Sequence, residues 1–145
     1  MNTIGGYAFD RSGLTSIVIP DSVNSIGKNA FYQCGNLQSV VIGTGARDLP
    51  EKMFCECRNL VEVIIPEGVE TIGEHAFNIC TGLKRVVIPS SVTNIGIYAF
   101  LDCVELSNVT FVGRTLDEVR DIGYVSGQTR PYPWGISDKS IITVA

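Results

Sequence analysis

The chain repeats itself every 23 residues, and this period constrains the fold more than any other feature of the sequence. Leucines recur at this interval, and phenylalanines recur at the same interval further along each unit. The two columns are Leu14, Leu37, Leu60, Leu83 and Leu106, and Phe31, Phe54, Phe77 and Phe100. A fixed period of this length predicts a solenoid of stacked coils, an architecture that presents a surface rather than enclosing a reaction.

Each unit predicts one short strand and a series of turns. Val40 and Ile42 recur at period two and are β-branched, which favours a strand. Coils that run in the same direction stack these strands into a parallel sheet, with Val40 and Ile42 pointing inward and the residues between them outward. A second apolar pair, such as Val69 with Ile72, precedes a glycine turn. The Ala-Phe pair and the following Cys are predicted to close the coil through a helical or 3₁₀ turn.

The period predicts a repeat array over residues 1–111 and a C-terminal capping segment over residues 112–145. The array consists of a truncated first repeat followed by four 23-residue steps. The first unit is one residue short and lacks the Cys, so we expect its turn to differ. Because the sequence starts within a unit, it predicts either a piece of a longer array or an end that a partner covers.

The capping segment begins with a capping box, Thr115 to Glu118, which predicts a short helix to about Ile122 that ends at Gly123. We expect Leu116, Val119 and Ile122 to cover the last coil. A loop over 126–131, the aromatic stretch 132–136 and a strand over 141–144 follow. Trp134 is either buried against the end of the array or a ligand anchor, and burial is the favoured interpretation.

Composition excludes several classes of protein. The net charge is -4 and the basic residues are scattered singly, so the sequence predicts neither nucleic-acid binding nor attachment to an anionic membrane. No apolar run approaches the ~20 residues that span a bilayer. The first residues lack the features of a secretory signal.

The repeats resemble the BspA-type leucine-rich repeat. The unit L-x-x-V-x-I-P-x-x-V-x-x-I-G-x-x-A-F-x-x-C runs from Leu60 to Cys80 and again from Leu83 to Cys103. The resemblance implies a right-handed leucine-rich-repeat coil with a parallel sheet on its concave face, found in bacterial and protist surface proteins and associated with adhesion. It implies no catalytic residues and no cofactor. The unit spanning 43–54 departs from the motif; we expect the fold to stay intact there, and the sequence leaves the shape of its loop open.

Four cysteines form a further column, at Cys34, Cys57, Cys80 and Cys103. They fall on successive coils about 5 Å apart, and such a row does not converge on one centre as zinc requires. Neighbouring thiols approach disulfide distance, but a reduced, packed row is the favoured interpretation. Cys55 is predicted at a variable outer position.

Other motifs indicate no chemistry. His75 has no catalytic partners and is predicted to be solvated, with a pH-sensitive contact as the alternative. Gly43-Thr44-Gly45 is a poor phosphate loop because no helix follows it. Glu67, Glu70 and Glu74 lack the order of a calcium loop, so a solvated acidic edge is favoured. The chain is therefore predicted not to be an enzyme, and no metal site is predicted.

The outward strand positions form the candidate partner-binding surface. One outward row is aliphatic over most of its length, as expected of an interaction site, although β propensity alone also favours such residues. The candidate residues are Val18, Gln38, Ser39, Val41, Glu62, Ile64, Lys84, Arg85, Val87, Asn108 and Thr110.

The leading functional prediction is a protein-binding or adhesion module of a cell-surface or secreted protein, with a host or matrix protein as partner. A structural spacer that self-associates through its N-terminal edge is the alternative. Carbohydrate binding is a further alternative, disfavoured because the outward strand positions carry no aromatic rows.

Overall fold

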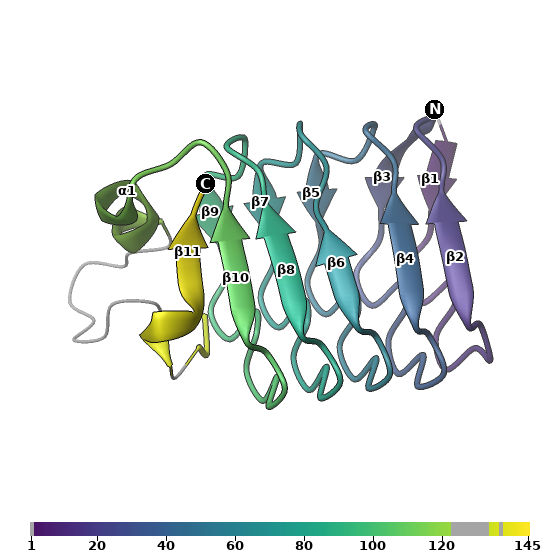
Figure 1. Cartoon of the computed structure of the whole chain (residues 1–145). Coiled ribbons are helices and arrows are strands. Elements are labelled where there is room, and N and C mark those ends of the chain that lie inside the picture. The colour runs from purple at the N-terminus through teal and green to yellow at the C-terminus, as the bar shows by residue number, and fades with distance from the viewer. Residues whose placement is uncertain (1, 123–133, 137) are drawn as a thin grey trace.

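The structure, a computed structural model, describes residues 2–122, 134–136 and 138–145. Its main element is a six-stranded parallel sheet in the order β11-β10-β8-β6-β4-β2, with one strand from each coil (Figure 1). The strands are β2 (Ser16–Ile19), β4 (Ser39–Ile42), β6 (Glu62–Ile64), β8 (Arg85–Ile88), β10 (Asn108–Phe111) and β11 (Ile142–Val144). The pairing from β2 to β10 advances by 23 residues at each step, as in Val63, Val86 and Val109. The predicted parallel solenoid is confirmed.

The two sides of the sheet differ as the alternation predicts. The inner row is buried and consists of Ile19, Ile42, Ile65, Ile88 and Phe111. The neighbouring inner row is buried at Val63, Val86 and Val109 but only half-buried at Ile17 and Val40. Successive side chains of a strand point to opposite faces, so the residues between these rows lie on the outside.

Shorter strands line the opposite side of each coil. β1 (Asn2–Ile4) pairs with β3 (Val23–Ile26), and β5 (Asp48–Leu49), β7 (Thr71–Ile72) and β9 (Asn94–Ile95) form a three-stranded parallel sheet. Figure 1 shows these strands behind the six-stranded sheet. The sequence predicted apolar pairs and turns here rather than strands. A two-residue strand is too short to show an alternation, and its pairing comes from stacking of the coils.

The turns between the two sides alternate local and inter-coil hydrogen bonds. Asn78 donates its N–H to the carbonyl of His75 at 3.1 Å, a 3₁₀-type bond, whereas Ile79 donates to Leu101 of the next coil at 2.8 Å. His75 and Ile79 both have positive φ, 53° and 59°. These left-handed residues prevent a continuous helix and turn every second N–H toward the neighbouring coil.

The first unit keeps this geometry only as far as Ser12, and its turn then differs from those of the later units, as its shorter length predicted. Tyr7 and Arg11 have φ of 57° and 53°, and Arg11 donates its N–H to the carbonyl of Tyr32 at 2.8 Å. After Ser12 the unit lacks the second turn that later units form before their leucine, as at Gly35 and Asn36, so the shortening lies between Ser12 and Leu14.

The unit spanning 43–54 closes like its neighbours, which gives the loop shape that its departure from the motif had left open. Ala46 donates its N–H to Gly43 at 3.4 Å, as Val69 does to Pro66 at 3.4 Å. A Cβ at Gly45 would collide with the carbonyl of the preceding coil. Glycine suits this position because the two backbones approach closely at this point.

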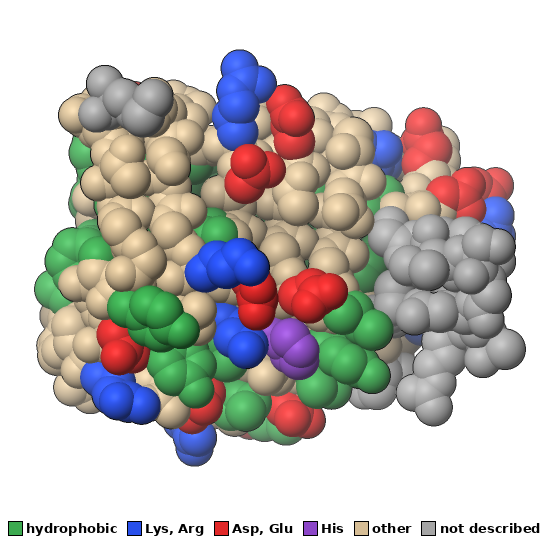
Figure 2. Space-filling model, turned by 180° about the vertical axis from the view of Figure 1, so that it is seen from behind, with side chains coloured by type: hydrophobic (Ala, Val, Ile, Leu, Met, Phe, Trp, Pro, Cys, Tyr) green, Lys and Arg blue, Asp and Glu red, His purple; other side chains and the backbone are tan. Residues whose placement is uncertain are grey.

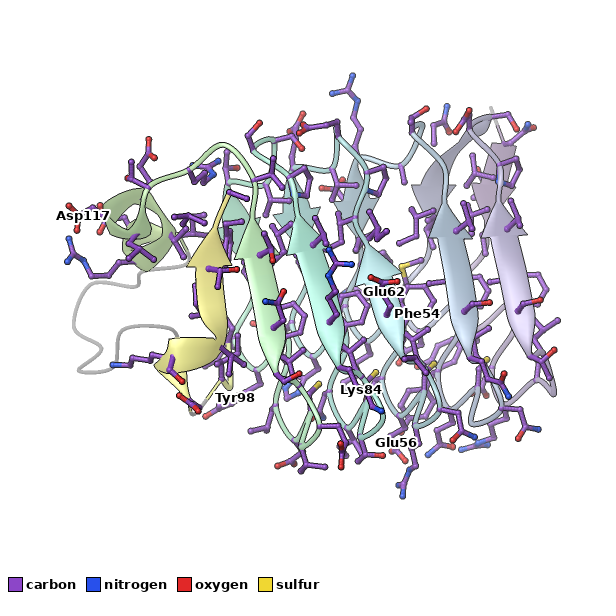
Figure 3. All side chains as sticks on the ribbon, viewed as in Figure 1. Phe54, Glu56, Glu62, Lys84, Tyr98 and Asp117 are labelled. Atoms are coloured by element: carbon purple, nitrogen blue, oxygen red, sulfur yellow. The ribbon has the colours of Figure 1, made fainter. Side chains whose placement is uncertain are left out.

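The core is built from columns that run along the array. The phenylalanine rings stack with centroid separations of 5.1, 5.3, 5.5 and 5.4 Å from Phe9 through Phe31, Phe54 and Phe77 to Phe100. Phe54 is labelled in Figure 3. The leucines of the three central coils, Leu37, Leu60 and Leu83, are fully buried beside these rings. Stacked columns give each coil the same core, which explains the constant period.

The C-terminal segment covers the last coil. Helix α1 (Leu116–Asp121) has Thr115 as its N-cap, and the predicted capping box is confirmed in both directions. Val119 and Ile122 are buried, but Leu116 is 55% exposed, so the prediction that Leu116 helps to cover the coil is wrong. A six-residue helix packs only the side facing the array, and Leu116 starts the helix on the outside.

The remainder of the capping segment supplies Trp134, which is fully buried as predicted and lies 5.7 Å from Phe111 between ring centroids. A 3₁₀ helix, Lys139–Ile141, then leads into β11, so the strand begins one residue later than predicted. The predicted helix end at Gly123, the loop over 126–131 and the aromatic residues 132–133 lie outside the described residues. The division into 1–111 and 112–145 stays a prediction.

Candidate functional site

The candidate surface is the outer face of the six-stranded sheet, where the register of the strands aligns equivalent residues of successive repeats. Ser16, Ser39, Glu62, Arg85 and Asn108 pair with one another across β2, β4, β6, β8 and β10. Two residues further along, Val18 pairs with Val41, and Ile64 pairs with Val87, which in turn pairs with Thr110. The structure therefore places the two predicted rows side by side on one face.

The second row is aliphatic and strongly exposed over three neighbouring strands. Val18, Val41 and Ile64 are 68%, 58% and 57% exposed. Val87 and Thr110 are half-buried, so the exposed row is shorter than predicted. Thr110 lies beside β11, where its hydroxyl is 3.1 Å from that of Thr143, and neighbouring side chains cover this end of the sheet.

The first row is polar and partly ordered by side-chain contacts. The Arg85 guanidinium donates to the Glu62 carboxylate at 2.7 Å, and both side chains are exposed. An exposed pair of this kind contributes at most about 1 kcal/mol to stability. At the end of the row, the Thr110 hydroxyl donates to Asn108 at 2.7 Å, which leaves Asn108 half-buried. Glu62 and Lys84 are labelled in Figure 3.

Two further candidates, Gln38 and Lys84, stand directly before β4 and β8 and are exposed. Their backbones continue the ladder, because Lys84 donates its N–H to Val61 at 2.8 Å and Val61 donates to Gln38 at 3.3 Å. Val61 was not predicted as part of the surface, yet it is 45% exposed. Its position among polar residues at the start of the strands gave no periodic signal. The candidate surface thus has an aliphatic centre with polar residues around it.

The cysteine column is structural. In each coil the thiol donates to the carbonyl of the phenylalanine in the preceding coil, at 3.0 to 3.2 Å: Cys34 to Phe9, Cys57 to Phe31, Cys80 to Phe54 and Cys103 to Phe77. Burial raises the pKa of the Cys80 thiol well above its ordinary value and that of Cys103 to about 12. All the cysteines are free thiols.

Cys55 does not occupy the outer position predicted for it. Its side chain is only 4% exposed, and burial raises the pKa of its thiol. It directly follows Phe54 in a turn where neighbouring coils cover the side chain. Within the described residues, no three His, Cys, Asp or Glu side chains are grouped as a metal site requires.

His75 is half-buried, which corrects the prediction of a solvated side chain. Its ring lies 5.5 Å from that of Tyr98, and its Nδ1 atom is buried without a hydrogen-bond partner among the described residues. Figure 2 shows the histidine on the back of the molecule beside hydrophobic side chains. The column that contains His75 varies in residue type because its shared feature is a positive φ rather than exposure.

The other motifs carry no assembled chemistry. Gly43, Thr44 and Gly45 form a tight loop in which the Thr44 N–H donates to Asp21 at 2.8 Å. Glu70 is paired with Arg47 at 3.0 Å. Glu67 and Glu74 are exposed, as a solvated acidic edge predicts.

Comparison with solved structures identifies bacterial relatives. A leucine-rich cell surface protein from Faecalibacterium prausnitzii is 38% identical with a TM-score of 0.81, and the match covers 87% of this chain and 33% of that protein. A leucine-rich repeat protein from T. pallidum is 30% identical with a TM-score of 0.73, over 83% of this chain and 60% of that one. The chain therefore spans one third and three fifths of these two proteins.

A leucine-rich repeat protein from Bacteroides ovatus shares the fold at 24% identity and a TM-score of 0.57, over 99% of this chain and 45% of that protein. No functionally curated protein matches the chain significantly. The described part of the chain holds no helix with the length and hydropathy of a transmembrane segment. The profile of the BspA type leucine-rich repeat region matches residues 2–123 in six copies. The chain belongs to the BspA-type leucine-rich repeat family.

Proposed function

We propose that the chain is a non-catalytic protein-binding module of a cell-surface protein and that the outer face of its six-stranded sheet holds the partner. The observation that supports this most strongly is the exposed aliphatic row Val18, Val41 and Ile64. The description of the Faecalibacterium relative as a cell surface protein supports the location.

The surroundings of this row suit a protein interface. Val18 pairs with Val41 on the neighbouring strand, and Ile64 lies on the next strand of the same face, so the three side chains form a strip across the sheet. Polar side chains border the strip, among them Gln38, Lys84 and the ion pair of Glu62 with Arg85. An apolar centre with a polar rim is the usual composition of a protein interface. We place the partner among extracellular matrix or host surface proteins, following the association of the family with adhesion.

The alternative explanation is that β propensity alone selects these residues. Substitution by threonine separates the two explanations because threonine keeps the β-branched shape while removing apolar surface. The test variant carries Val18→Thr, Val41→Thr and Ile64→Thr. The control variant carries Val104→Thr, Val112→Thr and Leu116→Thr, three residues that are 75%, 38% and 55% exposed and lie outside the strands.

Both variants and the parent chain are passed over immobilised fibronectin, laminin and fibrinogen, and binding is measured by surface plasmon resonance. We expect the parent and the control to bind one of these proteins and the sheet variant to bind at least about tenfold more weakly, the loss of about 1.4 kcal/mol of apolar contact. Equal binding by the two variants, or no binding by the parent, would refute the proposal.

Self-association is a second candidate. Phe9, Leu14 and Ile17 are only half-buried, whereas the matching residues of the central coils, Phe54, Leu60 and Val63, are fully buried. Light scattering across a concentration series tests this use of the N-terminal edge. A dimer that dissociates on dilution supports self-association, and a constant monomer mass excludes it.

A further inference from the structure

A cavity of about 380 Å³ lies where the turn of the last repeat meets the capping segment. The repeat contributes the wall from Phe100 to Cys103, with Val104 and Leu106. The capping segment contributes Gly135, Ile136, Asp138 and Ile141. This cavity is separate from the sheet face, and no motif in the sequence predicted it.

The cavity exists because the capping segment follows the path of a coil with too few residues. The Trp134 carbonyl accepts the N–H of Phe100 at 2.8 Å, so Trp134 stands one coil beyond Ala99. Ile142 pairs with Val109 and stands one coil beyond it. The chain takes ten residue steps from Ala99 to Val109 but eight from Trp134 to Ile142. The shorter path leaves space where a full repeat would place its Phe-x-x-Cys turn.

An N–H donor at this end lacks the acceptor that its counterparts have. In three earlier coils the N–H at this position donates to the next coil at 2.8 to 2.9 Å: Gln33 to Cys55, Glu56 to Asn78 and Ile79 to Leu101. In the last coil the position is Asp102, and no described residue accepts its N–H. Gly135, with φ of 90°, turns the capping segment away from the ladder after Trp134. The cavity wall therefore offers a hydrogen-bond donor to a ligand carbonyl.

A carbonyl acceptor at this end is also underused. The thiol ladder supplies a donor to the phenylalanine carbonyl of every coil from Phe9 to Phe77. The capping segment has no cysteine, and within the described part of the chain the Phe100 carbonyl receives only the N–H of Cys103, at 3.4 Å. A carbonyl has two lone pairs and accepts a second donor readily. A ligand that carries both a donor and an acceptor matches this pair of backbone groups.

Two carboxylates, those of Asp102 and Asp138, line the cavity beside apolar side chains. Both side chains are exposed. One oxygen of Asp138 accepts from the N–H and the hydroxyl of Ser140, at 2.9 and 2.7 Å, which leaves its other oxygen available. The charge of the cavity is thus complementary to a cation with an apolar body.

We propose that this cavity binds the amino-terminal residue of a peptide that begins with an aliphatic side chain. The α-ammonium group complements Asp102 and Asp138 and supplies the donor for the Phe100 carbonyl. The first peptide carbonyl accepts the Asp102 N–H. The aliphatic side chain lies against Leu106, Ile136 and Ile141. Such a ligand fills the place of the missing turn with the groups that a repeat would have supplied.

The probe is L-leucinamide, an aliphatic residue with a free ammonium and an amide carbonyl, titrated into the ¹⁵N-labelled chain at about pH 6.5, where its amino group is protonated. We expect saturable shifts at the amides of Asp102, Gly135 and Ile136 with a Kd of about 10 mM, ordinary for nine non-hydrogen atoms. The matched neutral compound 4-methylpentanamide lacks only the amino group. We expect it to bind at least about fivefold more weakly, the usual upper effect of one exposed charge pair.

Asp102→Asn should weaken leucinamide binding by about fivefold and leave 4-methylpentanamide unchanged. Asparagine tolerates the φ of 59° at this position, so the fold should persist. Asp138→Asn is the second variant, because an amide oxygen still accepts from Ser140. Asp48→Asn, on the exposed side of β5, is the control and should bind like the parent. Equal binding of the two compounds, unsaturated shifts, or shifts away from the cavity would overturn the proposal.

Discussion

The phenylalanine column gives the sharpest test of the packing, through Phe77→Ala. Phe77 is fully buried, and its ring stacks on those of Phe54 and Phe100 at 5.5 and 5.4 Å. Truncation loses about 2 kcal/mol of transfer free energy. It also leaves a cavity of about 100 Å³ between two rings, which adds about 2.4 kcal/mol at about 24 cal/mol per Å³. We therefore expect the free energy of unfolding to fall by about 3–5 kcal/mol.

The assay is urea unfolding, followed by circular dichroism and by the fluorescence of Trp134, the single tryptophan. An unchanged m-value is required for the comparison. Phe9→Ala is the control, because Phe9 is half-buried and has one stacking partner, Phe31 at 5.1 Å. We expect it to lose about 1–2 kcal/mol. A loss below about 1 kcal/mol for Phe77→Ala, or equal losses for both variants, would refute the assignment of the phenylalanine column as a continuous buried core.

Three other predictions concern the sheet, the cap and the thiols. Val41→Lys should change the free energy of unfolding by less than about 0.5 kcal/mol because the side chain points outward, whereas Val63→Lys should abolish cooperative unfolding in the same urea assay. Thr115→Ala should lower thermal stability by about 1 kcal/mol. Hydrogen bonds from the Thr115 backbone and hydroxyl lower the pKa of Glu118. The stabilisation from the capping box should therefore be fully present above the ordinary glutamate pKa and be lost as the pH falls through the lowered pKa of Glu118. Melting temperatures measured at a series of acidic pH values test this. Burial raises the pKa of the Cys80 thiol, so the native protein should resist alkylation at Cys80. The protein should also lose stability as the pH rises above the ordinary thiol pKa of 9.0. Rapid labelling of Cys80 without unfolding would contradict the buried position of this thiol.

The sequence predicted the features that recur in every repeat and missed those that depend on how the backbone of one coil packs against its neighbours. Inward positions such as Val63 and Ile65 recur at a fixed interval, so their burial could be read from the period. The capping box at Thr115 carries its own local signal. The strand β7 has two residues, too few for an alternation. The positive φ at His75 is imposed by the neighbouring coils, and a column that holds Tyr, Asn, Lys and His gives no residue signature for it.

The candidate surface was predicted in the same way, with one difference. The outward direction of Val18 and Val41 follows from the alternation, whereas the partial cover of Val87 and Thr110 depends on their neighbours, including β11. The sequence predicted a closing strand but not which side chains it would shelter. The cavity was also missed, because it results from the difference in length between the capping segment and a full coil.

The thiol-to-carbonyl ladder has a consequence for how the array can change in length. Each coil is joined to the one before it by the same set of bonds, including Cys57 to Phe31 and Cys80 to Phe54. Deleting one residue inside a strand would displace every later bond by one position unless a turn absorbed the change, as the first unit does between Ser12 and Leu14. Removing residues 60–82 instead would place Leu83 directly after Asn59 with all columns aligned. The array therefore keeps every column and every inter-coil bond when it gains or loses a whole coil of 23 residues.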